Sequence, residues 1–132
     1  MITHLKDQKC LDIDYEGANN LLIRNLFDRS SRLGSVGRVY TFQKGGQICS
    51  HQHRYNHLYF VLEGEGIISI DGVEHYVNKG SYCIIPSRTV HKVRNPGDRD
   101  FVLLGIAENS EDFKMKKWNG DEKKREADSR SI

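Results

Sequence analysis

Residues 45–64, with the sequence GGQICSHQHRYNHLYFVLEG, decide how the rest of the chain is interpreted. The stretch holds His51, His53 and His57, three of the protein's six histidines, between glycines at its two ends. Residues i and i+2 of an extended strand project to the same side. His51 and His53 therefore share a face, and His57 keeps that parity if the backbone stays extended. The spacing predicts imidazoles gathered on one side of a strand.

A second segment, residues 80–95 with the sequence GSYCIIPSRTVHKVRN, adds His91 from a strand expected to be adjacent in space. A single histidine in a strand is usually a surface or core residue, but four in this arrangement indicate a ligand set. Imidazole is the commonest side-chain ligand of transition metals. The sequence predicts that His51, His53, His57 and His91 hold one divalent transition metal ion, which is Fe, Ni, Mn, Cu or Zn. His4 and His75 lie outside this pattern.

Short apolar segments separated by glycine-containing turns run through most of the chain. The turns recur every 8–12 residues, which is the spacing of an all-β sandwich or barrel. About nine or ten strands are expected, among them residues 20–27, 36–42, 58–62, 66–70, 73–77, 81–85, 91–94 and 100–107.

Three turn signals are expected to connect these strands. Residues 44–46 (Lys-Gly-Gly) are expected to end the strand at 36–42, and residues 63–65 (Glu-Gly-Glu) to join two strands in a hairpin. Asp71-Gly72 is among the strongest short hairpin signals.

The 132 residues are expected to form one domain. Residues 1–17 are expected to form a loose N-terminal arm or a short edge strand, and residues 18–108 the β-barrel domain. Residues 109–132 are expected to form a charged C-terminal tail, with a short helix at 111–118 before a solvated, poorly ordered end.

Composition argues against several classes of partner. The net charge of +2 does not indicate nucleic acid or an anionic membrane surface. No apolar run approaches the roughly 20 residues of a membrane helix, and the N-terminus has no apolar signal sequence, so a cytoplasmic location is expected. Three widely spaced cysteines do not indicate a disulfide framework. Cys49 lies two residues before His51 and shares its face if that segment is extended.

With both segments in view, the chain resembles a single-domain cupin. The first cupin motif is G-x5-H-x-H-x3-E-x6-G and the second is G-x5-P-x-G-x2-H-x3-N. The matching residues are Gly45, His51, His53 and Gly64 in the first motif, and Gly80, Pro86, His91 and Asn95 in the second. The resemblance implies a conical antiparallel β-barrel of the RmlC-like jelly-roll type, often dimeric, with one divalent metal ion inside.

Two residues depart from the cupin motifs. His57 replaces the glutamate of the first motif, so four neutral imidazoles would leave the ion its full 2+ charge. That ligand set favours a lower oxidation state, anionic substrates, and Fe, Ni, Cu or Zn over oxygen-preferring ions, although Mn is compatible with it. Arg88 replaces the inner glycine of the second motif, which implies a turn without positive φ or a side chain at the barrel mouth.

Four protein ligands on an octahedral ion would leave two adjacent positions for a small chelating oxygenated substrate. The sequence therefore favours a metal-dependent enzyme, a dioxygenase marginally ahead of a lyase, decarboxylase or isomerase. Tyr59 is the first candidate for a hydrogen-bond donor beside the ligands, with an aromatic core role as its alternative. Further candidates are Glu65, Arg38, Tyr40 and Cys49.

Two further expectations concern ligands and oligomeric state. A non-catalytic module that binds a carbohydrate-like or organic-acid ligand is the alternative function, because no general base is evident near the ligands. The apolar segment 21–27 is expected to add to a sheet edge and support a homodimer.

Overall fold

Ten β-strands and one 3-10 turn form the described part of this computed structural model, which comprises residues 2–28, 30–108 and 124–126. In chain order they are η1 (Leu5–Asp7), β1 (Cys10–Tyr15), β2 (Ala18–Phe27), β3 (Ser35–His51), β4 (His57–Glu63), β5 (Glu65–Ile70), β6 (Val73–Asn78), β7 (Tyr82–Ile85), β8 (His91–Arg94), β9 (Phe101–Glu108) and β10 (Lys124–Glu126). The all-β prediction is confirmed.

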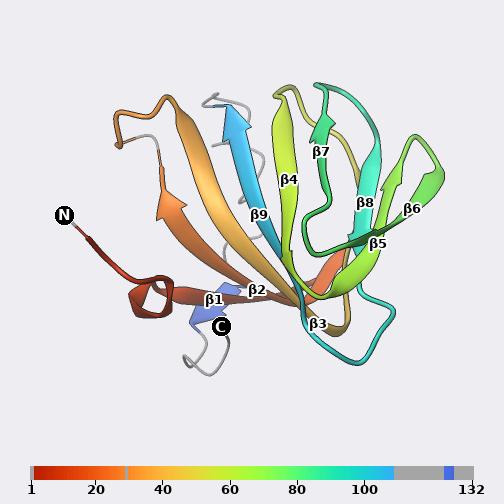
Figure 1. Cartoon of the computed structure of the whole chain (residues 1–132), viewed down its shortest axis with the longest axis horizontal. Coiled ribbons are helices and arrows are strands. Elements are labelled where there is room, and N and C mark those ends of the chain that lie inside the picture. Colours follow the sequence, from red (N-terminus) through yellow and green to blue (C-terminus); the bar gives the residue numbers. More distant parts are fainter. Residues whose placement is uncertain (1, 29, 109–123, 127–132) are drawn as a thin grey trace.

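The strands pair only antiparallel and curve into a nearly closed barrel, as Figure 1 shows. One sheet has the order β10-β1-β2-β3-β8-β5-β6. Strand β9 pairs with β3 on the same edge as β8, opposite β2, and continues to β4 and β7. The first half of β3 pairs with β9, from Ser35↔Glu108 to Phe42↔Phe101. Its second half pairs with β8, ending at His51↔His91. Strand β3 therefore belongs to both walls of the barrel.

The expected turn at residues 44–46 is absent, because β3 continues through it to His51. Gly45 has φ 76°, in the left-handed region, and a Cβ on Gly46 would overlap with the carbonyl oxygen of Asn20. The register between β2 and β3 shifts opposite these glycines, between Asn19 and Leu21. The glycines thus make a β-bulge that bends the strand from one sheet into the other.

The two hairpin predictions have opposite outcomes. Asp71 and Gly72 have φ values of 50° and 81°, as a type I′ turn requires, and join the paired strands β5 and β6. Gly64 also has a positive φ, of 77°, but β4 and β5 do not pair with each other. The hairpin expected at residues 63–65 is therefore wrong, because the chain crosses there between the two walls.

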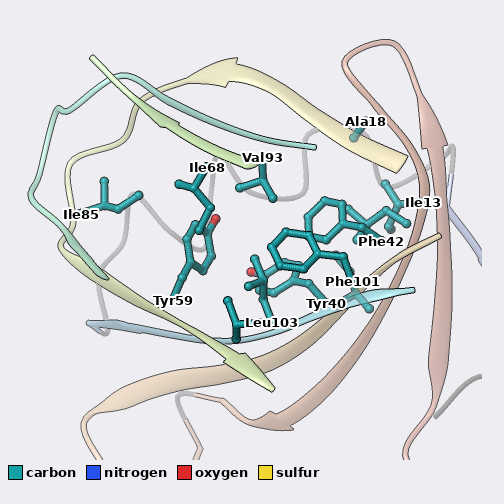
Figure 2. Packing of buried hydrophobic residues seen from close by; sticks show 13 residues of the cluster. Ile13, Ala18, Tyr40, Phe42, Tyr59, Ile68, Ile85, Val93, Phe101 and Leu103 are labelled. Carbon is teal, nitrogen blue, oxygen red and sulfur yellow. The ribbon is translucent and has the colours of Figure 1, made fainter. Parts of the chain in front are cut away.

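Alternate residues of the facing strands fill the barrel with apolar side chains. Figure 2 shows the aromatic part of this core, in which Phe42 and Phe101 lie with ring centroids 5.9 Å apart and Tyr40 meets Tyr59 edge-on at 6.1 Å. The buried cluster consists of Ile13, Ala18, Leu21, Ile23, Tyr40, Phe42, Tyr59, Val61, Ile68, Ile85, Val93, Phe101 and Leu103.

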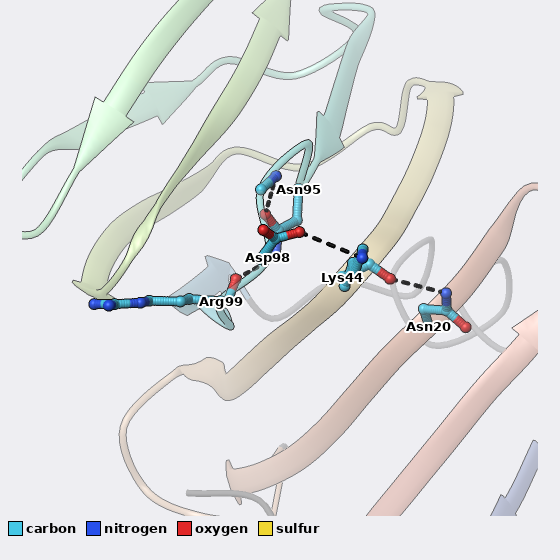
Figure 3. A network of polar contacts seen from close by, with 6 residues as sticks. Asn20, Lys44, Asn95, Asp98 and Arg99 are labelled. Atoms are coloured by element: carbon cyan, nitrogen blue, oxygen red, sulfur yellow. Dashed lines mark hydrogen bonds and ion pairs between the residues drawn. The ribbon is translucent and has the colours of Figure 1, made fainter.

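Asn95, the last residue of the second motif, ties the turn after β8 to β3 and is 2% exposed. Its side-chain amide donates to the carbonyl oxygens of Phe42 and Arg99 at 2.8 and 2.7 Å, and its Oδ1 accepts from the Gly97 amide. Figure 3 shows Asn95 beside the Lys44–Asp98 ion pair. That pair is solvent-exposed and contributes little to stability, so the buried amide makes the connection.

The ends of the chain differ from expectation in part. Residues 10–15 form β1, which pairs with β2 and β10, so part of the predicted arm is a strand within the sheet. Strand β2 lies between β1 and β3, so the expectation that segment 21–27 covers a sheet edge is wrong. Homodimer formation itself stays a prediction. The predicted helix and tail fall outside the described residues, apart from β10. Within the described residues, no helix is long and apolar enough to span a bilayer.

Gly64→Ala should destabilise the protein much more than Gly72→Ala. Both glycines have a positive φ, which costs an alanine about 1 kcal/mol. A Cβ at residue 64 would also overlap with the carbonyl oxygen of Asp100, whereas a Cβ at residue 72 meets nothing within 4 Å. We expect an additional loss of about 2 kcal/mol for Gly64→Ala, measured by urea denaturation. Equal losses would show that this close backbone contact does not limit the position.

Candidate metal centre

Three histidines converge at the end of β3. His51 is the last residue of β3, His53 follows in the connecting segment, and His91 is the first residue of β8, directly opposite His51 in the register. Their potential ligand atoms all lie within 4.8 Å of one another. The ring centroids of His51 and His91 are 4.1 Å apart, and His53 lies 4.8 Å from His91. The three-histidine part of the predicted cluster is thus present.

Two backbone carbonyls orient the imidazoles of His51 and His91. Nδ1 of His51 lies 2.8 Å from the carbonyl oxygen of Cys49, and Nδ1 of His91 lies 2.8 Å from that of Thr89. A carbonyl oxygen can only accept, so each Nδ1 carries the proton. Each Nε2 then has the lone pair available to bind a cation, which is the usual outer arrangement of a metal-binding histidine.

His57 lies beside this group without being part of it. It begins β4, is 6% exposed, and its ring centroid lies 4.7 Å from that of His53 and 4.8 Å from that of His91. The ring therefore points into the barrel, as the parity argument requires. Coordination of an ion by His57, and so the complete set of four ligands, stays a prediction.

The three-histidine group suits a transition metal ion. Metal–imidazole bonds of about 2.1 Å require ligand nitrogens at most about 4.2 Å apart, so movements below about 1 Å would bring the set into coordination. All three residues are histidines, a ligand type suited to Zn, Cu, Fe and Ni. Because these ligands are neutral, they would not reduce the charge of such an ion, and its full charge would attract an incoming oxygen ligand.

Two tyrosines pack directly against the imidazoles. Tyr55 stacks on His53 with a centroid separation of 3.8 Å and an interplanar angle of 3°. Tyr59 meets His57 edge-on at 4.7 Å. Burial, together with Tyr40, Tyr55 and Cys83, raises the pKa of Tyr59 well above its ordinary value, so its phenol stays protonated and can donate a hydrogen bond.

Tyr55 is not among the residues predicted from the sequence, although residues 51, 53, 55, 57 and 59 form one alternating series. That parity was the signal that could have found it. The position of Tyr59 agrees with both of its interpretations, because it belongs to the apolar core and also touches His57.

Arg38 places a buried cation behind the histidines. It is 6% exposed, and its Nε donates to Oδ1 of Asn25 at 2.7 Å. Arg38 lines a small hollow together with His53 and His57. Burial lowers the pKa of Arg38, and the neighbouring Tyr40 and Tyr55 oppose that shift. Arg38 is therefore one of the sequence candidates that the fold does bring to the site, and Tyr40 on the same strand is another.

The two remaining candidates from the sequence, Glu65 and Cys49, are both exposed. Glu65 is exposed and borders a separate hollow with Lys79 and Arg99, away from the histidines. The sequence ranked it too high because residues 63–65 cross between the walls. Cys49 is exposed, and its carbonyl oxygen lies 2.8 Å from Nδ1 of His51.

The backbone conformation of Arg88 decides between the two alternatives that its position in the second motif allows. Its φ is 65°, so the turn keeps the left-handed conformation that suits glycine, and the expectation of a turn without positive φ is wrong. Its amide donates to the carbonyl oxygen of His53 at 2.6 Å, which explains why this strained backbone is maintained. The side chain borders an open hollow with Gln52, His53 and Arg54.

A cavity of about 270 Å³ opens beside His51 and His53. Most of its wall comes from the N-terminal strands β1 and β2 and from the end of β3. Glu16, between β1 and β2, is the carboxylate that borders this cavity among the described residues. Sequence reasoning missed Glu16 because residues 1–17 carry little pattern, and only the pairing of β1 with β2 brings Glu16 to the cavity that His51 and His53 also line.

The fold and the histidine arrangement agree with a family comparison. A family model described as a cupin domain matches residues 38–107, which contain all four predicted ligands and both motifs. The chain belongs to the cupin family.

Three proteins illustrate its relatives. Dimethylsulfoniopropionate lyase DddW of Ruegeria pomeroyi is 40% identical over 53 residues, which are 40% of this chain and 35% of that protein. A predicted oxalate decarboxylase of Thermotoga maritima has a similar structure (TM-score 0.76, 17% identity, 83% of this chain and 100% of that one). So does the polyketide cyclase RemF of Streptomyces resistomycificus (TM-score 0.73, 22% identity, 85% and 88%). The curated relatives are matched over half of their length or less.

Replacing His51 or His91 with alanine should abolish retention of a stoichiometric metal ion, and His57→Ala should weaken it. Each change removes one of the predicted ligands. His75→Ala is the control, because His75 lies exposed on β6. Elemental analysis after metal loading and desalting measures the result. Unchanged metal content in the His51 and His91 variants would contradict a metal centre at this position.

The Arg88→Gly variant should be more stable than the Arg88→Ala variant by about 1 kcal/mol, because alanine keeps the cost of a positive φ and glycine does not. Gln52 lies in the same region but has no positive φ, so Gln52→Ala should be more stable than Gln52→Gly. Urea denaturation of the four variants measures both differences. The same order at both positions would show that the backbone of residue 88 is not strained.

Proposed function

We propose that this cupin is a metal-dependent enzyme that acts on a small oxygenated molecule able to chelate the bound ion. The observation that carries the proposal is the group of three histidines, two of them oriented by backbone carbonyls, of which His51 and His53 line an open cavity. His51, His53 and His91 would hold a divalent ion, with His57 as the fourth ligand. When bound there, such an ion supplies Lewis acidity to a coordinated oxygen.

Lyase-type chemistry is the reaction class that the relatives support. The similar proteins are called a lyase, a predicted decarboxylase and a cyclase, and none of these names describes an oxygenase. A dioxygenase, which the sequence alone places marginally first, is the second candidate. A ligand set of neutral histidines, which suits a lower oxidation state, favours it.

The residues around the cavity have separate roles in the proposed lyase reaction. Glu16 accepts the proton that leaves a carbon next to the chelated oxygen, because it is the described carboxylate that borders the cavity. Tyr59 holds the imidazole of His57 in place through its edge contact and stays protonated. Tyr55 fixes the plane of His53 by stacking. Arg38 adds positive charge behind the ligands and favours their neutral form.

A non-catalytic ligand-binding module is the remaining alternative. The sequence supports this alternative because it shows no general base near the histidines. The position of Glu16 at the border of the cavity weakens that argument.

Turnover should occur without oxygen in the metal-loaded protein. We expect product formation from a panel of hydroxy- and keto-substituted acids and esters under nitrogen, followed by chromatography and mass spectrometry. Glu16→Gln should lower kcat by about 10²-fold or more while metal content stays the same. His91→Ala should lose both metal and turnover, and His75→Ala should lose neither.

Three outcomes would contradict parts of the proposal. Turnover only in the presence of oxygen, with oxygen consumed, would identify a dioxygenase. Ligand-induced thermal stabilisation without conversion, across Fe, Ni, Mn, Cu and Zn, would identify the binding module. Turnover that is unchanged in Glu16→Gln would exclude Glu16 as the base.

A further inference from the structure

We infer that the cavity beside the histidines selects a ligand with an apolar body and a single uncharged or singly charged chelating head, of the catechol or aromatic enol type, over short dianionic acids. The inference rests on the proposed function, since it names the substrate class of the same centre. The cavity wall, its charge and its volume carry it.

The wall of the cavity is mostly apolar and belongs to the rigid core. Ile13, Leu21 and Ile23 project into it from β1 and β2, and each is 1–2% exposed. Ala18 and Ile48, which face each other across the β2–β3 pairing, complete this side. Figure 2 shows Ile13 and Ala18 at the edge of the core cluster, beyond the aromatic rings of Phe42 and Phe101. Apolar atoms of a ligand bound here would be removed from water, and few polar contacts of the wall would be lost.

The charge around the cavity disfavours a second anionic group on the ligand. Among the described residues that line it, there is no lysine or arginine, and Glu16 contributes a negative charge. A dicarboxylate with one group on the ion would therefore find aliphatic side chains, Glu16 and exposed neutral donors such as Ser50 and Gln52 for its other group, but no cation. That placement is unfavourable, because a carboxylate that leaves water needs a cation or several hydrogen-bond donors.

The volume of the cavity fits a compact ligand. About 270 Å³ lies just below the range of roughly 300–1,000 Å³ that is usual for small-molecule sites. Its lining contains both His51 and His53 and the aliphatic residues of β1, β2 and β3. A molecule whose chelating oxygens reach the histidines thus has room for one ring or a short chain against the aliphatic wall.

A basic hollow on another side of His53 is the competing feature. Arg54 and Arg88 border it with Gln52, in a space of about 220 Å³ that is open to solvent. Both arginines are exposed, so water and salt weaken their attraction for an anion bound there. The apolar cavity, which is lined by buried side chains of the core, therefore dominates selection.

Calorimetric titration of the zinc-loaded protein tests the inference without catalysis. We expect 4-butylcatechol to bind at least tenfold more tightly than catechol, because the butyl group adds buried apolar surface. Oxalate should bind more weakly than 4-butylcatechol. None of the three should bind appreciably to the metal-free protein.

Ile48→Lys and Ile84→Lys form a matched pair of variants. Ile48 lines the cavity and is partly buried, whereas Ile84 is 58% exposed on β7. Ile48→Lys should remove the preference for the butyl chain and improve oxalate binding, and Ile84→Lys should change neither. Metal content and thermal unfolding confirm that each variant is folded. The comparison of the three ligands on the unmodified protein decides the question even if Ile48→Lys fails to fold.

The outcomes separate this inference from the proposed function. Tight binding of catechol with no gain from the butyl chain, or tighter binding of oxalate, would overturn the inference and leave a metal-centred enzyme intact. Failure of all three to bind a zinc-loaded protein would overturn both, since no coordination position would then be open to a chelating ligand.

Discussion

The antiparallel pairing of β3 with β8 is the constraint on which the histidine centre depends. It sets His51 directly opposite His91, with ring centroids 4.1 Å apart. The same geometry repeats on each strand, because each Nδ1 lies 2.8 Å from the carbonyl oxygen of the residue two positions earlier. The backbone therefore fixes both the position and the tautomer of these imidazoles. The imidazoles therefore have little freedom to move, as a pre-formed metal centre requires.

The pairing is possible because β3 serves both walls of the barrel. The bulge at Gly45 and Gly46 turns the strand from β9 toward β8, and Asn95 holds the end of β8 against that bend through buried hydrogen bonds. Gly45 and Asn95 of the cupin motifs, together with Gly46, thus have a mechanical role. They position a site that they do not touch.

The surroundings of His53 give the centre its chemical asymmetry. Tyr55 stacks on one face of the ring, and Arg38 lies buried in the hollow behind it. An apolar cavity with Glu16 at its border opens on one side, and a basic hollow opens on another. The neutral ligand set leaves the charge of a bound ion undiminished, so the surrounding charges and apolar walls determine which ligands that ion can accept.

The sequence alone predicted the all-β class, most of the strands and the Asp71-Gly72 hairpin, because alternation and turn chemistry are local. It also predicted that His51, His53 and His91 would meet, since the motif spacing encodes parity and framing glycines. The folded structure was needed to show that β3 bends instead of ending, that the chain crosses at Gly64, and that β2 lies inside the sheet. Likewise, only the fold brought Glu16, Tyr55 and the aliphatic wall of β1 and β2 to the histidines. Strand pairing between distant segments decides these features, and a local pattern of residues carries no information about which strands become neighbours.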